Sequence, residues 1–513
     1  VIYYEELSKI TKEDLVAFAN KHYKENYAVV YKRTGKDPNI QKVEKPQITK
    51  VPLNREDRSE LHVKLANQET VKLQPKFLDY KTDLEFFNIG PLEVIYKENT
   101  DNDLFEMTYH FNYGKNQDPK IELAASLMNY VGAGNLSPEE LKTEFYKLGA
   151  GYNFSTSTDG EETQITLSGL SENMEASIKL FESLLENPVG TQDALDKLVG
   201  RILKSRSDAK KNKNLILSRQ LYSYAKYGEV NPASNVLTSE ELMKVSVAEL
   251  TDRIKALTKK QHRILFYGNQ DEKTLTNLVK TYHKIPESLK EVSDAQTYSE
   301  KNYDKEYVFW THFDMVQTEI ILLSKQELLD NTKTAAIRLF NQYFGGGMNS
   351  IVFQEIREAQ GLAYSVFSAY RQANKPDRYD YLFSYIGIQS DKQKEALSSM
   401  FSLINNLPES PQAFEIGKQA ILNKIESERI TKAGVLYNYL SAEKRGIDYD
   451  IREKVYNEVK AMDLEKLFEF HETYIKDKPH TILLIGNRDN IDLKNLEQYG
   501  TVKELSLETL FGF

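Results

Sequence analysis

The sequence predicts an α+β fold with two homologous domains, over residues 86–290 and 291–513. Three observations predict it. First, the 513 residues exceed what one compact core normally holds, since a domain averages about 150 residues. Second, segments with the alternation of a strand are followed by segments with the periodicity of a helix. Third, this arrangement recurs along the chain, which indicates repeated domains.

One sequence unit occurs three times. Each copy starts at a residue whose side chain suits a helix N-cap, namely Thr11, Ser246 or Asp463. A helical stretch, a short turn, an apolar run and a glycine follow in each copy, so the unit predicts a capped helix and then a buried strand. The three apolar runs lie over residues 27–31, 264–267 and 482–485.

The segments before the second and third copies also match each other. Residues 105–113 alternate between apolar and polar side chains, as a strand does, and a helix is predicted around residues 123–131. Their counterparts are a strand region over 308–323 and a helix around 334–344. These matches predict that both segments are whole domains.

The chain before the first whole domain has a different organisation. Residues 1–36 carry one copy of the unit without the body of a domain, so we interpret them as the tail of a preceding homologous domain. Residues 37–85 are rich in charges and predict a long extended linker. Because the first residue is Val1, we expect a piece of a longer chain. The linker contains Pro38, Pro46, Pro52 and Pro75.

Composition excludes several classes of function. A net charge of −9 disfavours a nucleic-acid partner. The absence of cysteine excludes disulfides and thiolate metal sites, and it fits either cytoplasm or periplasm. No two histidines have the spacing of a local zinc motif. The longest apolar runs are too short to span a bilayer, so no membrane span is expected.

Residues 344–366 carry a recognisable signature. They contain Gly345, Gly346 and Gly347, then a helix-forming stretch, then Gly361. This segment closely resembles the signature of the pitrilysin/insulinase family of zinc metallopeptidases, the inverzincins. The repeated domains and the proline-bearing linker resemble that family too, so the resemblance covers essentially the whole chain. It implies α+β domains, each a mixed, largely antiparallel sheet with helices packed on it, and it identifies the chain as the C-terminal non-catalytic half.

The resemblance also locates a degenerate metal site. The positions that answer the family's His-x-x-Glu-His motif are Ala125, Met128 and Asn129, which offer no ligand beyond a weak amide. The segment expected to supply the next ligand, residues 192–214, contains no Glu. We therefore expect no metal and no catalytic residue in this chain. The resemblance implies that zinc belongs to a partner, the N-terminal catalytic half of the same precursor.

Two residues are candidates for substrate binding. In the family an Arg and a Tyr seven residues apart contact the substrate backbone, and they match Arg357 and Tyr364. Locally, residues 350–359 predict a helix that Gly361 ends, followed by a strand. A guanidinium and a phenol can hold a peptide carbonyl or the oxyanion it becomes. Without the resemblance, Arg357 is explained by the helix macrodipole and Tyr364 by packing.

Other readings remain for individual features. The signature glycines, Gly345 to Gly347, follow a helix and have no Gly-Lys-Ser/Thr sequel, so they predict a tight helix–helix turn instead of a phosphate loop. His110 lies on the polar face of its strand and is expected to be solvated.

The favoured function is a non-catalytic half that closes over unfolded peptides and contributes substrate-binding residues to the zinc site of the missing half. It is expected to be inactive alone. The alternative is a catalytically inactive peptide-binding or structural subunit of the same fold.

Overall fold

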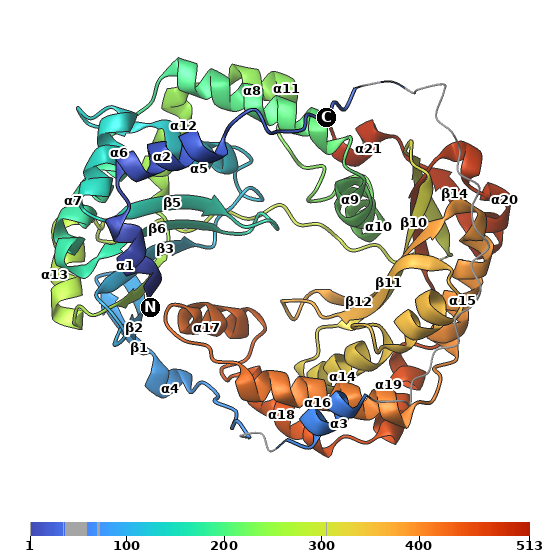
Figure 1. Ribbon diagram of the computed structural model, residues 1–513. Coiled ribbons are helices and arrows are strands. Elements are labelled where there is room, and N and C mark those ends of the chain that lie inside the picture. Colours follow the sequence, from blue (N-terminus) through green and yellow to red (C-terminus); the bar gives the residue numbers. More distant parts are fainter. Residues whose placement is uncertain (1, 34, 36–58, 69–71, 304) are drawn as a thin grey trace. The chain divides into compact units, whose positions relative to one another are not determined.

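The computed structural model describes residues 2–33, 35, 59–68, 72–303 and 305–513 (Figure 1). They fall into two units, Val1–Val71 and Lys72–Phe513. Most of the predicted linker, residues 36–58 and 69–71, lies outside the described residues.

The first unit contains three helices among its described residues, α1 (Ile2–Lys9), α2 (Lys12–His22) and α3 (Glu60–Ala66). Thr11 caps α2 as predicted, because its hydroxyl accepts from the backbone of Asp14 and the Asp14 carboxylate accepts from the backbone of Thr11. The strand predicted over residues 27–31 is absent, and Val30 is 92% exposed. A strand needs a neighbour to satisfy its backbone, and the described part of this unit offers no sheet.

Two six-stranded sheets organise the second unit. The first has the order β1-β2-β8-β3-β6-β5, and the second has β11-β12-β10-β13-β9-β14. Read from opposite ends the orders correspond, with β8 and β13 in the same place. The bounds are β1 Glu85–Ile89, β2 Leu92–Glu98, β3 Leu104–Phe111, β5 Gly151–Thr156, β6 Thr163–Leu170, β8 Arg263–Gly268, β9 Tyr307–His312, β10 Gln317–Leu328, β11 Ala363–Arg371, β12 Tyr379–Gln389, β13 Thr481–Gly486 and β14 Thr501–Glu504.

Both sheets are mixed and largely antiparallel. In the first, β8 runs parallel to β2, and in the second, β9 runs parallel to β13 and β14. All the other neighbouring pairs in these sheets are antiparallel. The predicted apolar runs of the second and third copies form β8 and β13, which are buried along nearly their whole length. This confirms the predicted α+β class with helices on mixed sheets.

The helices of the second unit surround these sheets. The first half of the unit contains α4 Tyr80–Asp83, α5 Ile121–Leu127, α6 Pro138–Lys147, α7 Met174–Glu186, α8 Gln192–Ala209, α9 Lys213–Leu215, α10 Tyr222–Tyr227, α11 Ser239–Lys244, α12 Val247–Leu257 and α13 Glu272–Tyr282, with a short sheet of β4 (Gly132–Ala133) and β7 (Pro188–Val189). The second half contains α14 Thr334–Phe344, α15 Gln393–Asn405, α16 Pro411–Ser427, α17 Gly434–Lys444, α18 Ile451–Ala461, α19 Leu464–Tyr474, α20 Leu493–Leu496 and α21 Leu507–Phe511. Two segments, Ile216–Leu221 and Phe353–Ala359, are π-helical.

Each sheet has its own core, and each domain also packs a helical segment on the sheet of the other. Residues of α5, α7, α12 and α13 pack on one face of the first sheet, and α14 and α15 contact the second sheet. Leu436 and Leu440 of α17 pack with Ile95 and Leu265 on the opposite face of the first sheet. Reciprocally, the π-helical segment Ile216–Leu221 packs on the second sheet. Apolar contacts therefore join the two domains.

The end of the predicted linker is anchored to the second domain. The Leu78 amide donates to Asp450 Oδ2 over 3.0 Å, and the Gln74 carbonyl accepts from the guanidinium of Arg429 over 3.0 Å. Phe77 packs against the core of the second sheet. Over these residues the chain is held in place and does not act as a free spacer.

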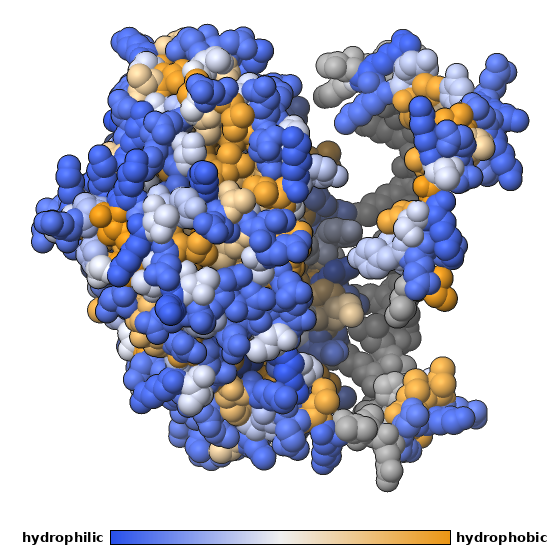
Figure 2. All heavy atoms as spheres, turned by 90° about the vertical axis from the view of Figure 1, so that its left-hand side faces the viewer, coloured by the Kyte–Doolittle hydropathy of each residue, from blue (hydrophilic) through white to orange (hydrophobic). Residues whose placement is uncertain are grey.

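The outer surface is mainly polar. Figure 2 shows a face on which hydrophilic side chains predominate and apolar ones form small groups between them. Among the described residues, no helix is long and apolar enough to cross a membrane.

Candidate functional site

The signature glycines form a tight turn after α14, as predicted. A Cβ on Gly345 would lie 2.1 Å from the carbonyl oxygen of Ser368 in β11, and one on Gly346 would lie 2.7 Å from the carbonyl oxygen of Asn341. Gly347 has φ +99°, in the region that favours glycine. The first two glycines thus permit close backbone approach, and the third permits the turn.

Arg357 and Tyr364 lie on the two segments that follow this turn. Arg357 is in the π-helical segment Phe353–Ala359, Gly361 ends the helical segment with φ +61°, and Tyr364 is the second residue of β11. The sequence predicted this order of elements but not the π-helical form. A single π-turn inside a helix is often found at functional sites.

The structure brings these two side chains together. The guanidinium carbon of Arg357 is 5.5 Å from the ring centroid of Tyr364 and 4.8 Å from that of Phe353. Tyr364 is 76% exposed and the side chain of Arg357 is 40% exposed. The nearest carboxylate oxygen to Arg357 belongs to Glu358, 3.6 Å from Nε. The pair therefore presents donors to solvent from a fixed scaffold.

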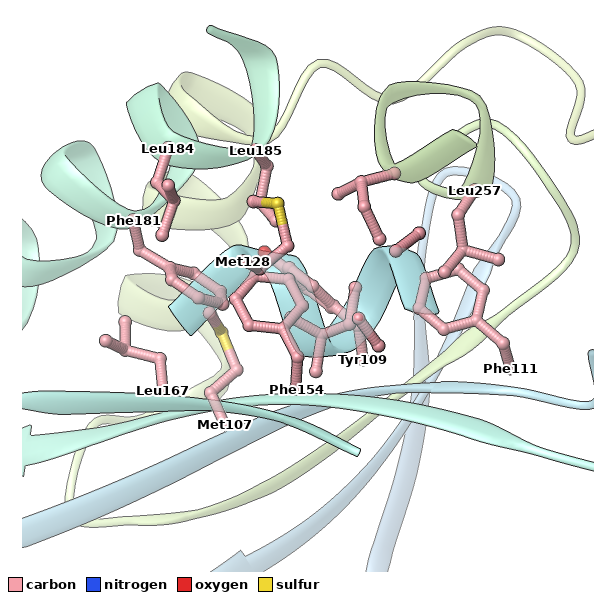
Figure 3. Packing of buried hydrophobic residues seen from close by; sticks show 14 of the residues in the cluster. Met107, Tyr109, Phe111, Met128, Phe154, Leu167, Phe181, Leu184, Leu185 and Leu257 are labelled. Carbon is pink, nitrogen blue, oxygen red and sulfur yellow. The ribbon is translucent and has the colours of Figure 1, made fainter. Parts of the chain in front are cut away.

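The degenerate metal positions are part of the core instead. Ala125 and Met128 are 2% and 1% exposed. Figure 3 shows Met128 among the packed apolar side chains of the core. Asn129 directs its amide to the carbonyl of Ser126 over 3.5 Å. These residues do not fit a zinc ion.

The rest of the described chain offers no alternative metal site. Over residues 2–33, 35, 59–68, 72–303 and 305–513, no group of three or more His, Cys, Asp or Glu side chains is placed to hold an ion.

Residues 244–420, which include the signature segment, match the family model described as the peptidase M16 inactive domain. Over this segment the chain is similar to the peptidase M16 family, the pitrilysin/insulinase metallopeptidases. The non-peptidase homolog YmxG of Helicobacter pylori is 21% identical over 425 residues, which are 78% of this chain and 93% of that protein.

Solved structures share the fold. The peptidase M16 inactive domain from Pseudomonas fluorescens has a TM-score of 0.63 at 17% identity and covers 79% of this chain and 98% of that one. The periplasmic protease PqqL of Escherichia coli has a TM-score of 0.62 at 14% identity, over 93% of this chain and 51% of PqqL. The chain therefore spans about half the length of PqqL.

His110 is buried, and the expectation that it is solvated was wrong. It is 1% exposed, and its Nε2 lies 3.4 Å from Glu162 Oε2. Burial alone would raise the pKa of Glu162, but hydrogen bonds with His110 and Lys444 lower that pKa to about 2. The polar face of the first sheet is covered because the second domain packs against it, and Lys444 comes from α17 of that domain.

Ion pairs fix the two domains to each other at the same place. Glu161 lies 2.6 Å from Lys375 Nζ and 2.9 Å from Arg378 Nη2, and Arg263 Nη2 lies 2.5 Å from Glu443. Each pair joins the first domain to the second, and a cavity of about 450 Å³ lies among them. Buried or half-buried pairs of this kind specify geometry more than they add stability.

A cavity lined by tyrosines adjoins these ion pairs, and sequence reasoning did not find it. It has a volume of about 290 Å³ and contains Lys226, whose Nζ lies 4.4 Å from the ring centroid of Tyr381 and 5.2 Å from that of Tyr227. The Tyr381 hydroxyl donates to Glu300 over 2.7 Å. The abundance of tyrosine in the sequence was the only available signal, and it specified no position.

Proposed function

We propose that this chain is the non-catalytic half of an M16 zinc metalloendopeptidase. It closes over unfolded peptides and contributes Arg357 and Tyr364 to the zinc site of a separate catalytic half. The observation that carries this proposal is a contrast. Ala125 and Met128, at the positions that would hold metal, are buried in apolar packing, while Tyr364 is exposed and lies next to the partly exposed Arg357, whose ion pair is with its sequence neighbour Glu358.

The chemistry of the pair suits a peptide carbonyl. The guanidinium of Arg357 offers several N–H donors, and the phenol of Tyr364 offers one O–H donor. Stacking near the ring restricts the guanidinium, so less side-chain entropy is lost when it binds. Donors aimed at a carbonyl stabilise the negative charge that develops on its oxygen during hydrolysis. The pair is thus a substrate-binding element that needs no metal of its own.

The scaffold around the pair is rigid, which supports this role. Ile356, next to Arg357, is fully buried, and its carbonyl accepts from the amide of Leu362 over 3.0 Å. This bond ties the end of the helical segment to the start of β11. A positioned binding group loses less entropy than one on a mobile loop.

The catalytic half is the partner that the proposal requires. In the proposal zinc belongs to that half. The coverage of about half of PqqL supports a two-half protein. In the proposal, residues 1–36 are the tail of a preceding homologous domain and residues 37–85 link it to the domains over 86–290 and 291–513. The helices α2, α12 and α19 support this, because each has 11 residues and a side-chain N-cap.

The test uses the complete two-half protein. We expect Arg357→Ala and Tyr364→Phe each to lower the turnover of an unfolded peptide about tenfold or more, with unchanged zinc content. Arg201 and Tyr130 form a matched control pair, since the Arg201 guanidinium carbon lies 4.5 Å from the Tyr130 ring centroid in the first domain. Arg201→Ala and Tyr130→Phe should leave turnover unchanged. Normal turnover in both Arg357→Ala and Tyr364→Phe would reject the assigned role.

A second candidate function is a catalytically inactive peptide-binding or structural subunit. The match to a protein described as a non-peptidase homolog, over 93% of its length, favours it. The two candidates differ in one measurement, the turnover of an unfolded peptide after addition of a zinc-bearing half. Restored turnover supports the first, and peptide binding without any turnover supports the second.

A further inference from the structure

A cavity lined by the first domain and by the C-terminal residues of the second has the features of a ligand site that the proposed function does not use. It has a volume of about 320 Å³ and lies between α5, α8 and the π-helical segment Ile216–Leu221, next to Phe511 and Phe513 near α21 (Figure 1). This volume is at the small end of the range for pockets that hold small molecules.

Charged side chains gather around this cavity without pairing. Three cations, Lys115, Arg206 and Arg219, line it together with one carboxylate, Glu122. The ion pairs found across the described residues include none among these four side chains. Burial lowers the pKa of Lys115 and of Arg206, and the nearby charge of Glu122 opposes the shift in both. Lys115 Nζ also donates to the carbonyl of Pro232 over 2.9 Å, and the charged lining as a whole carries more positive than negative charge.

Arg206 and Gln220 both line the cavity, and each has a polar side-chain atom that the described residues leave without a partner. Nη1 of Arg206 and Oε1 of Gln220 are buried and have no hydrogen-bond partner within the described residues. The first is a donor and the second an acceptor. Buried polar groups in proteins are almost always satisfied, so this donor and this acceptor are available at one cavity to a ligand that has both functions.

The remaining wall of the cavity is apolar. Ile202 and Leu237 lie on it, and the ring of Phe513 stands over the Arg206 guanidinium with 4.6 Å between the ring centroid and the guanidinium carbon. A ligand for this site thus needs an anionic group for the cations, an N–H for Gln220, and an apolar side chain. An N-acylated apolar amino acid, which is also the C-terminal residue of a peptide, combines these three groups.

We propose that this cavity binds the carboxylate end of an apolar amino-acid residue whose nitrogen is acylated. The carboxylate interacts with Arg206 and Arg219, the amide N–H donates to Gln220, and the side chain lies against the apolar wall. Arg–carboxylate pairs are the strongest of these contacts, because both partners are charged. The site goes beyond the proposed function, because it uses neither Arg357 nor Tyr364.

Binding to the chain alone tests the proposal, so failure here is distinguishable from failure of the proposed function. Calorimetry or ligand-observed NMR would compare N-acetyl-leucine with N-acetyl-leucinamide and with inorganic phosphate. We expect N-acetyl-leucine to bind at least tenfold more tightly than either. Equal binding of the neutral amide, equal binding of phosphate, or no binding of N-acetyl-leucine would each overturn the proposal.

Substitutions of lining residues test whether the ligand binds in this cavity. Arg206→Gln should weaken binding of N-acetyl-leucine at least tenfold, while Glu122→Gln should strengthen it several-fold by removing a repulsive charge. Arg201→Gln is the matched control, because it makes the same charge change in α8 but does not line the cavity. If Arg206→Gln does not fold, Arg219→Gln, on an exposed residue, should weaken binding several-fold. Unchanged affinity in the folded variants would overturn the assignment.

Discussion

Replacing Gly345 by alanine tests the close approach on which the signature turn depends. Gly345 has φ −138° and ψ 0°, which alanine also adopts, so the backbone conformation is not strained by the change. The added methyl group, however, would lie 2.1 Å from the carbonyl oxygen and 2.4 Å from the amide nitrogen of Ser368. Both are backbone atoms of β11, so neither can rotate away. The end of α14 and β11 must then separate by about 1 Å to reach normal contact.

The magnitude follows from two contributions. Forcing an extra carbon into packed structure costs about 1–3 kcal/mol. The separation also stretches the hydrogen bond from the Ser368 amide to the Gly345 carbonyl, which is already 3.4 Å long. Loss of this hydrogen bond costs about 1 kcal/mol. We therefore expect Gly345→Ala to lower the free energy of unfolding by about 2–4 kcal/mol.

The assay is urea or thermal unfolding of the chain followed by circular dichroism. For a domain of this size a loss of 1 kcal/mol lowers Tm by about 2–4 °C. Gly200→Ala is the matched control, since an added Cβ there meets no atom within 4 Å and alanine favours the middle of α8 by up to about 1 kcal/mol. If Gly345→Ala melts like the wild type, the turn opens without cost and the steric reasoning is refuted.

Two further predictions concern buried polar groups. Burial lowers the pKa of His262 and of His480 to about 4. Between pH 6.5 and pH 4 the unfolded chain therefore binds two protons that the native chain does not. Because of this difference, acidification over that range lowers the free energy of unfolding by on the order of 3 kcal/mol per histidine. Asp380, whose burial raises its pKa to about 6, offsets part of this. The urea midpoint should be lower at pH 5 than at pH 7, and His480→Gln should reduce the difference; equal midpoints contradict the prediction. Separately, Asp450→Ala should cost about 3 kcal/mol, because the buried Arg452 loses its closest partner, 2.5 Å away, and keeps only Glu428 at 3.5 Å. Asp450→Asn, which can still accept hydrogen bonds, should cost less in the same melts.

Local features of this chain were predictable because they depend on residues close together in the sequence. The N-caps at Thr11, Ser246 and Asp463 form as expected, each from a side chain and a backbone amide two or three positions later. Gly361 ends its helical segment in the left-handed region, also as expected. The family signature placed Arg357 and Tyr364 on successive elements, although their function remains a proposal.

Predictions failed where the outcome depended on distant segments. The run over residues 27–31 has the apolar pattern of β8 and β13 but finds no neighbouring strand among the described residues. His110 lies on the polar face of β3, as the alternation predicted. It is nevertheless buried, because Lys444 and its helix cover that face of the sheet. A periodic pattern specifies which face a side chain occupies, and it does not specify what packs on that face.

The sequence by itself determined the α+β class, the positions of caps and turns, and the absence of ligand chemistry at Ala125 and Met128. These properties follow from residue type and short-range spacing. Only the tertiary structure decided which helices cross to the opposite domain, which carboxylates meet which cations between the domains, and that Arg206 and Gln220 meet at one cavity. Such contacts join residues far apart in the chain, and they exist only after the sheets and helices have packed.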